Sequence, residues 1–236
     1  MNASFRKNVL ILLAVLIFSS FAGLHTVSAQ VPDLVSRWNG DAVSGTTVLD
    51  TSGGNNGTIR GGVTIRPWEI GKNFHPDGNT GYVSMGNPEN LNFGTDPFSL
   101  EVWFRLGLRG RGIPPGNIIR KSNYPVEGPG YGYWLKAGGD NRILEFYAGE
   151  TAGIPGEPRG RVATTIDTDT WYHAVATKDS AGRMELYLNG ELKGAAEAPG
   201  ANTTSGAPFT LGAWADRFGV TETFFGVIGE VSVYSR

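Results

Sequence analysis

Three side chains of complementary chemistry alternate along one short stretch of the sequence. Glu101, Trp103 and Arg105 occupy every second position of FSLEVWFRL. Side chains two apart lie on one face of an extended strand, so a carboxylate, an indole ring and a guanidinium would sit side by side. Sugar rings present apolar C–H faces edged by hydroxyls, and a ring flanked by hydrogen-bonding groups suits them. The stretch therefore predicts a ligand-binding surface.

Five further residues meet the same requirement, because each places an aromatic ring or an amide outside the expected core. Trp134 falls on the polar face of a predicted strand. Tyr124 and Trp214 fall in predicted loops, Asn123 precedes Tyr124, and Trp68 is another loop aromatic. The predicted ligand-binding residues are Glu101, Trp103, Arg105, Asn123, Tyr124, Trp134 and Trp214.

The acidic residues and histidines do not form a recognisable catalytic pattern. Retaining glycosidases use two carboxyl groups about 5 Å apart, but no E-x-D-x-E or related spacing occurs, and Glu101 is the only acid on its predicted strand. Past the first thirty residues only His75 and His173 remain, and two imidazoles make a poor zinc site. We therefore predict a non-catalytic protein. A glucanase or lyase of another type is the alternative, with Glu101 as the first residue to substitute.

The elements that must position these residues are strands. Past the first thirty residues, apolar and polar residues alternate in many stretches, whereas no window of eleven or more residues has helical spacing. Asn189-Gly190 predicts a two-residue hairpin turn, because both positions need positive φ. Gly- and Pro-rich stretches such as Leu49–Gly57 and Leu106–Asn117 predict loops. So many short strands without crossover helices favour an all-β, antiparallel two-sheet β-sandwich. The expected strands are Leu34–Trp38, Val63–Ile65, Tyr82–Met85, Phe98–Arg105, Ile118–Lys121, Tyr131–Lys136, Ile143–Tyr147, Arg161–Thr164, Trp171–Lys178, Met184–Leu188, Glu191–Lys193, Pro208–Leu211 and Val227–Tyr234.

The aromatic cluster TWYH lies within one of these strands. Alternation places Trp171 and His173 on one face, with Tyr172 and the alanines that follow on the other. Aromatic residues at alternate positions of a sandwich usually pack in the core, so the cluster predicts packing rather than ligand contact. We expect a buried, hydrogen-bonded His173, and His75, beside Pro-Asp-Gly, as the neighbour of a turn.

The N-terminus has the features of a secretory signal. Two basic residues precede an apolar run of ten residues, and Val27-Ser28-Ala29 supplies the small residues of a cleavage site. We expect residues 1–29 to be removed and 30–236 to form one domain. The predicted location is secreted or extracytoplasmic, with no transmembrane segment after cleavage. The chain contains no cysteine, so the fold does not depend on disulfides.

Charge argues against nucleic acid as a partner. Removing Arg6 and Lys7 leaves 18 of the 20 basic residues against 22 acidic ones, a net charge of about −4. No basic run occurs, whereas phosphate binding needs clustered Lys and Arg.

Five stretches, in order, resemble laminin-G-like (concanavalin A-like lectin/glucanase) domains of bacterial exported proteins. TWYHAVATKDSAGRMELYLNG resembles the T-W-Y-H segment and the strand ending in Y-x-N-G of that family. The other four are LVSRWNGDAVSGTTVLDTSGGNNGTIRGGVT, GKNFHPDGNTGYVSMGNPENLNFGTDPFSLEVWF, PFTLGAWAD and FFGVIGEVSVYSR. Together they span nearly all of residues 30–236.

The resemblance implies two curved sheets of the concanavalin A-like jelly-roll type and a role in binding carbohydrate or protein. The expected partner is a polysaccharide or glycoconjugate, with a cell-surface protein as the alternative. Relatives commonly hold a structural Ca²⁺, for which Asp41 and Glu230 are the candidate ligands. Gly229 stands where the family has an aspartate, and Ca²⁺ needs six to eight oxygens. Alternation also predicts that Glu230 points to the opposite face from residue 229.

Overall fold

The computed structural model describes residues 33–68, 71–108, 114–123, 130–151, 160–216 and 219–236. These residues belong to one compact unit, Asp33–Arg236. Residues 1–29 and Tyr124 lie outside the described residues. Within the described ranges, no helix has the length and apolarity needed to cross a membrane.

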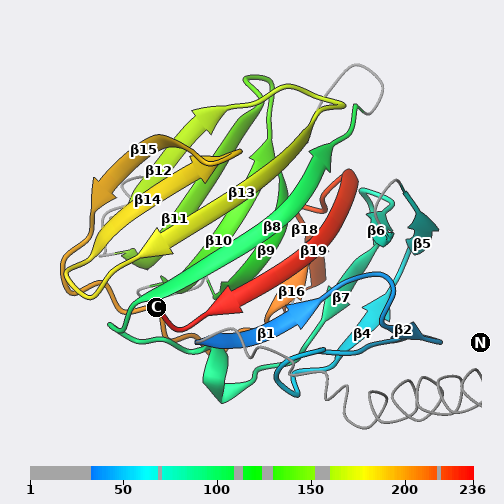
Figure 1. Ribbon diagram of the computed structural model, residues 1–236, viewed down its shortest axis with the longest axis horizontal. Coiled ribbons are helices and arrows are strands. Elements are labelled where there is room, and N and C mark those ends of the chain that lie inside the picture. Colours follow the sequence, from blue (N-terminus) through cyan, green and yellow to red (C-terminus); the bar gives the residue numbers. More distant parts are fainter. Residues whose placement is uncertain (1–32, 69–70, 109–113, 124–129, 152–159, 217–218) are drawn as a thin grey trace, which may run out of the picture. The chain divides into compact units, whose positions relative to one another are not determined.

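Two antiparallel sheets form the fold, which confirms the predicted β-sandwich (Figure 1). The eight-stranded sheet has the order β15-β14-β13-β8-β19-β6-β5, with β1 paired to β19. Its strands are β1 (Leu34–Trp38), β5 (Val63–Pro67), β6 (Lys72–Pro76), β8 (Phe98–Leu106), β13 (Trp171–Lys178), β14 (Arg183–Leu188), β15 (Glu191–Glu197) and β19 (Gly226–Tyr234).

The nine-stranded sheet lies behind it in Figure 1, with the order β12-β11-β10-β9-β16-β7-β4-β3-β2. Its strands are β2 (Val43–Ser44), β3 (Thr47–Val48), β4 (Gly57–Arg60), β7 (Tyr82–Ser84), β9 (Gly116–Ser122), β10 (Gly130–Gly138), β11 (Ile143–Thr151), β12 (Arg161–Thr165) and β16 (Thr210–Leu211). A small hairpin joins β17 (Trp214–Asp216) to β18 (Gly219–Thr221), and the 3-10 turn η1 covers Glu89–Leu91.

Alternation in β8 decides which residues face the core. Phe98, Leu100, Val102 and Phe104 are all fully buried, as the sequence predicts. Phe98 also packs against Tyr133 of the facing sheet, with ring centroids 4.8 Å apart. Each such side chain contributes about 1.5–3 kcal/mol when it leaves water. The register of β8 is therefore fixed, because a one-residue slip would turn this layer toward solvent.

The turn at Asn189-Gly190 has the predicted geometry, with φ of 52° and 81°. Strands β2 to β4, β6, β17 and β18 were not predicted, because they are only two to five residues long and too short to show an alternation. Trp214, expected in a loop, is the first residue of β17. His75, which we expected as the neighbour of a turn, is the fourth residue of β6.

One prediction about β19 is wrong, because the strand contains a bulge. Ile228 pairs with Phe104 and Val231 with Val102, so two residues of β19 stand opposite Trp103 alone. Ile228 and Val231 both enter the core, and the two residues between them both face outward. Glu230 therefore shares the outer face with Gly229 instead of opposing it.

Candidate functional site

A row of aromatic and charged side chains covers the outer face of the eight-stranded sheet. Strand pairing sets Trp171 opposite Arg105 and His173 opposite Trp103. Their neighbours along each strand point into the core, so these four side chains face outward. We call Trp68, Trp103, Trp171 and His173 the outer aromatic row.

This arrangement corrects the expectation that the TWYH cluster mostly packs in the core. Only Tyr172 stacks on a core ring, that of Phe104, at 5.8 Å between centroids. Trp171 and His173 lie on the other side of β13, since Ala174 and Ala176 occupy the buried face. His173 is hydrogen-bonded, as expected, but a quarter of its side chain remains exposed.

Trp103 is the most prominent ring of the row, because 47 % of the residue is exposed. The imidazole of His173 stacks on it with centroids 4.8 Å apart. The backbone N–H of His173 in turn donates to Oδ1 of Asn189, at 2.9 Å. The β14–β15 turn thus fixes the backbone of β13 at the residue whose imidazole stacks on Trp103.

Glu101 supplies a charged acceptor beside this stack. Its Oε1 lies 2.8 Å from Nε2 of His173, and the hydroxyl of Tyr234 donates to its Oε2 at 2.6 Å. Burial raises the pKa of Glu101, but the hydrogen bonds from Tyr234 and His173 outweigh burial and lower the pKa below its usual value. The carboxylate is therefore ionised at neutral pH.

Gly229 makes room for Trp103. A Cβ at this glycine would lie 3.0 Å from Cβ of Trp103 and 3.3 Å from Oδ1 of Asn73. These contacts are tighter than is usual, so any side chain there would require Trp103 or Asn73 to shift. The glycine therefore lets β19 pass beneath the exposed ring.

The other end of the row is built around Trp68, which is 41 % exposed. It follows β5 and lies 6.1 Å from the ring of Trp171. The guanidinium of Arg105 sits 5.0 Å from the Trp68 centroid, within the range of a cation–π contact, and its Nη1 lies 3.5 Å from Asp169. Two exposed indoles thus flank charged groups on one sheet face.

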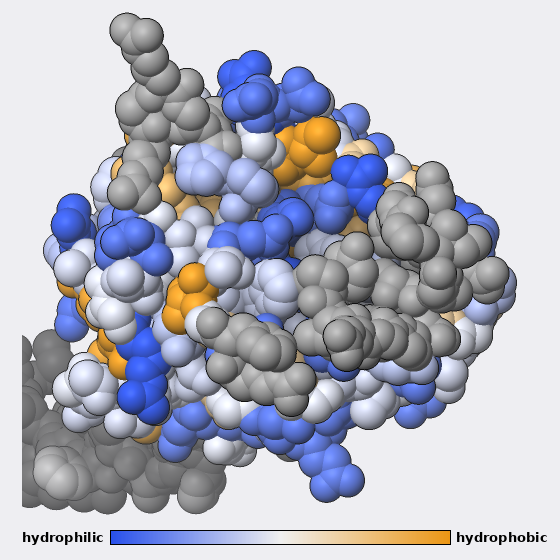
Figure 2. All heavy atoms as spheres, turned by 180° about the vertical axis from the view of Figure 1, so that it is seen from behind, coloured by the Kyte–Doolittle hydropathy of each residue, from blue (hydrophilic) through white to orange (hydrophobic). Residues whose placement is uncertain are grey.

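A second cluster occupies the outer face of the nine-stranded sheet. Arg120 is almost fully buried between the rings of Trp134 and Trp214, 5.0 and 4.4 Å from their centroids. Burial lowers the pKa of Arg120 to about 10 although Glu222 and Asp216 favour its charged form. Glu222 also lies 3.3 Å from Nζ of Lys136. Figure 2 shows hydrophilic residues gathered on this face.

Trp134 itself is buried, with 5 % exposure. It stacks on Tyr147 at 3.9 Å and donates its indole N–H to Glu145. Asn123 accepts the backbone N–H of Tyr131 at 2.8 Å and so ties β9 to β10.

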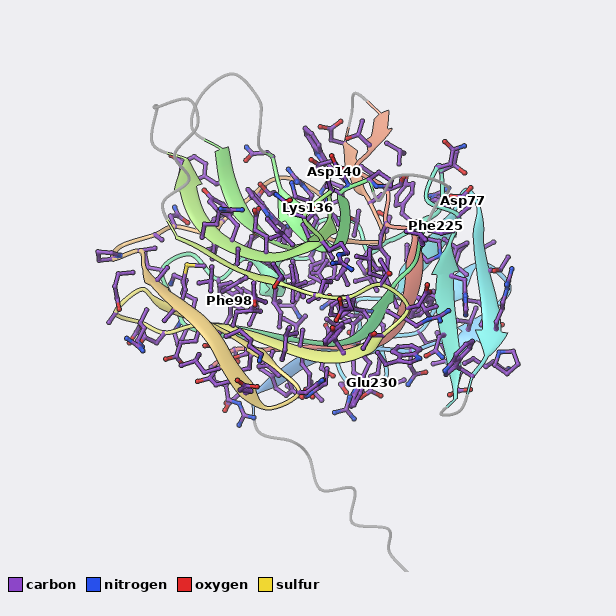
Figure 3. All side chains as sticks on the ribbon, turned by 90° about the horizontal axis from the view of Figure 1, so that it is seen from above. Asp77, Phe98, Lys136, Asp140, Phe225 and Glu230 are labelled. Atoms are coloured by element: carbon purple, nitrogen blue, oxygen red, sulfur yellow. The ribbon has the colours of Figure 1, made fainter. Side chains whose placement is uncertain are left out.

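The predicted ligand-binding residues therefore separate onto opposite faces of the sandwich. Glu101, Trp103 and Arg105 share the face of Glu230, whereas Trp134 alternates with the core residues of β10 and shares the face of Lys136. Figure 3 shows Lys136 and Glu230 on opposite sides. These residues cannot contribute to one site.

Comparisons with known proteins place the fold in a family. The model of the concanavalin A-like lectin/glucanases superfamily matches residues 77–236, more than half of the sequence. The chain belongs to this superfamily. A comparison with curated proteins gives no match.

Several solved structures of this fold are binding domains. The binding domain of Paraclostridial Mosquitocidal Protein 1 is similar with a TM-score of 0.63 at 16% identity, over 86% of this chain and 49% of that chain. The binding domain of botulinum neurotoxin DC, in complex with rat synaptotagmin II, has a TM-score of 0.64 at 18% identity, over 86% and 48%. This chain thus spans about half the length of these domains.

A third similar structure matches over nearly its whole length. Domain 4 of AbnA, a GH43 extracellular arabinanase from Geobacillus stearothermophilus, in complex with arabinotriose, has a TM-score of 0.57 at 20% identity, over 86% of this chain and 92% of that chain. At such identities these likenesses show the fold alone.

The two candidate calcium ligands already have other partners. Oδ1 of Asp41 accepts the backbone N–H of Lys72 at 3.2 Å, and Glu230 lies 3.6 Å from Nε of Arg37. Across the described part of the chain, no group of three or more His, Asp or Glu side chains gathers in a way that suits a metal ion.

The sequence does not reveal Trp171 and His173 as members of one surface with Trp103. Aromatic residues at alternate positions of a sandwich usually pack in the core, which is why the sequence predicts packing for this cluster. Alternation alone placed Trp171 and His173 together, but only the pairing of β13 with β8 places them beside Arg105 and Trp103.

Proposed function

We propose that the protein is an exported, non-catalytic module that binds a carbohydrate through the outer aromatic row. The observation that carries the proposal is the pair of exposed indoles, Trp68 and Trp103, flanked by the carboxylate of Glu101 and the guanidinium of Arg105. Exposed rings can stack on the C–H face of a sugar, while the charged groups bond its hydroxyls. The arabinotriose complex of AbnA domain 4, which shares the fold, supports this choice of ligand class.

The state of Glu101 favours binding over glycan cleavage. A general acid of a glycosidase has a raised pKa, whereas hydrogen bonds from Tyr234 and His173 lower the pKa of Glu101. Both oxygens already accept a hydrogen bond. Each can still accept a sugar hydroxyl, because a carboxylate has about four acceptor sites.

The first test measures binding to an array of polysaccharides, with and without Ca²⁺. We expect retention of at least one glycan. We also expect Trp103→Ala to weaken that binding about tenfold, because the exposed half of the indole is then no longer there for the bound sugar to cover. Leu192→Ala removes another exposed apolar side chain, 46 % exposed, and serves as the control.

Other outcomes would contradict the proposal. Failure to retain any glycan in either condition, together with binding to a cell-surface protein, would favour a protein-interaction module. New reducing ends or unsaturated products after incubation with the same glycans would show an enzyme. A rise in melting temperature with Ca²⁺ is a separate outcome that leaves the proposal intact: it would show that the native state binds a structural calcium, since a ligand bound only by the native state stabilises it.

A further inference from the structure

Three buried nitrogen atoms at the Trp68 end of the row have no hydrogen-bond partner among the described residues. They are Nε2 of His75, Nε of Arg105 and Nε1 of Trp171. Asp169 approaches Arg105 only through Nη1, at 3.5 Å, which leaves Nε available. A buried donor without an acceptor is costly. Arg105 and Trp171 lie opposite each other on neighbouring strands, so one acceptor can serve both, and His75 lies two strands further along the same face.

Strand register brings the three residues into one line. The pairs Phe74–Ile228 and Asp77–Phe225 set His75 level with Val227 on β19. Val227 pairs with Arg105 on β8, and Arg105 pairs with Trp171 on β13. Four adjacent strands therefore carry His75, Arg105 and Trp171 across the sheet on the same outer face.

The charge around this line is positive. Burial lowers the pKa of His75, and the nearby guanidinium groups of Arg66 and Arg105 lower it further. Arg66 comes from β5, the neighbour of β6, and donates to Thr64 through Nε. Asp169 is an opposing charge, but its side chain is 59% exposed.

We propose that this line of donors, beside the ring of Trp68, binds the carboxylate of an acidic sugar residue. The inference rests on the proposed glycan-binding function and names its ligand class. Arg105 and Trp171 donate to the carboxylate oxygens, and His75 adds a third donor in its Nε2–H tautomer. Trp68 stacks on the ring that bears the carboxylate.

The opposite end of the row gives the bound chain a direction. Glu101 stands four residues before Arg105 on β8, about 13 Å away along the strand. Its carboxylate accepts hydroxyl hydrogens but repels a uronate. The acidic residue of the glycan therefore lies at the Trp68 end, and neutral residues lie over Trp103.

The test compares oligosaccharides of galacturonate, mannuronate and glucuronate with their carboxyl-reduced forms by titration calorimetry. We expect at least one acidic form to bind roughly tenfold or more tightly than its reduced form, the effect of one charge-assisted hydrogen bond. Trp171→Phe keeps an aromatic ring at this position but removes the indole N–H, and should reduce this preference severalfold. Arg105→Gln should abolish it.

Arg183→Gln is the matched control, because Arg183 lies on β14 of the same sheet and pairs with Glu185 and Glu197. It should keep the preference. A second readout follows the indole N–H signal of Trp171 by NMR, identified by its loss in Trp171→Phe, during titration with free glucuronate and with acetate. Movement with glucuronate but not with acetate shows that the sugar ring is needed as well as the charge.

The outcomes separate this inference from the proposed function. Equal affinity for acidic and reduced forms, or a preference that survives Arg105→Gln, overturns the carboxylate site and leaves glycan binding intact. An equal response of the Trp171 signal to acetate and glucuronate overturns the assignment to a sugar. Absence of any glycan binding, or glycan binding that Trp103→Ala leaves unchanged, overturns the proposed function itself.

Discussion

Asp50 offers a sharp test of what stabilises this fold, because its carboxylate accepts the backbone hydrogen bonds of the loop that follows it. Five backbone N–H groups donate to it at 2.9–3.0 Å. The donors are Arg37, Ser52, Gly53, Gly54 and Asn55. Asn55 then accepts the indole N–H of the buried Trp38 through its carbonyl, at 2.8 Å.

The shift in the pKa of Asp50 gives the magnitude of its contribution to stability. Burial raises the pKa of Asp50, but the backbone hydrogen bonds outweigh burial and lower it from 3.8 to about 2. The difference corresponds to no more than about 2–3 kcal/mol of stability, which we discount to about 2 kcal/mol because the carboxylate is partly exposed to solvent. Since the pKa is lowered in the folded state, this stability is fully present above about pH 4 and is lost as the pH falls toward 2.

Asp50→Asn should remove this contribution to stability. The amide oxygen can still accept hydrogen bonds, but its NH₂ group would face the N–H groups of Gly54 and Asn55. We expect the variant to unfold at lower urea concentration at pH 7, with a loss of about 2 kcal/mol and a melting temperature lower by roughly 4–8 °C. At pH 3 the difference from the natural chain should shrink to about 1 kcal/mol, because the Asp50 carboxyl group of the unfolded chain is then mostly protonated.

Urea unfolding followed by tryptophan fluorescence at pH 7 and pH 3 measures both values. Asp140→Asn, at an exposed position after β10 (Figure 3), controls for the loss of one negative charge. An Asp50→Asn effect that is the same at both pH values would refute the reasoning, since the hydrogen bonds would then not depend on the charged form.

Three further predictions concern other parts of the fold. Gly229→Asp should displace Trp103, shift its fluorescence and weaken glycan binding, at a cost of about 1–3 kcal/mol in stability measured by urea unfolding. Lys178→Met should cost about 2–3 kcal/mol in the same assay, because the buried ammonium donates to the carbonyls of Thr95 and Asp96 at 2.9 and 3.3 Å. Asn189→Ala should lower the melting temperature by a few degrees, because it loses the bond to the His173 N–H and strains a position with φ of 52°; an unchanged melting temperature would contradict this.

The sequence predicts the strands that alternate cleanly and misses those that do not. The β8 stretch shows four apolar residues at every second position, so both its strand and its buried face follow directly. Strand β6 reads Lys-Asn-Phe-His-Pro, with only one large apolar side chain. Its place in the sheet depends on pairing with β19, which lies more than 150 residues away in the sequence.

Long-range strand pairing also limits how much of the candidate site the sequence predicts. Alternation shows that Glu101, Trp103 and Arg105 share a face, and it shows the same for Trp171 and His173. It does not show that β13 lies beside β8, or that Trp134 belongs to the other sheet. Those facts depend on long-range pairing, which no local pattern in these residues encodes.

The bulge in β19 connects the fold to the site. On one flank of Trp103, strand β13 supplies the stacked imidazole of His173. On the other flank, β19 supplies Gly229, which has no side chain to cover the indole. The resemblance to the superfamily implies an aspartate at this position, and an aspartate would contribute a carboxylate to a metal site. In this chain the glycine supplies no carboxylate, and the neighbouring Trp103 is 47 % exposed. The residue that weakens the case for calcium is therefore the residue that makes room for an aromatic binding surface.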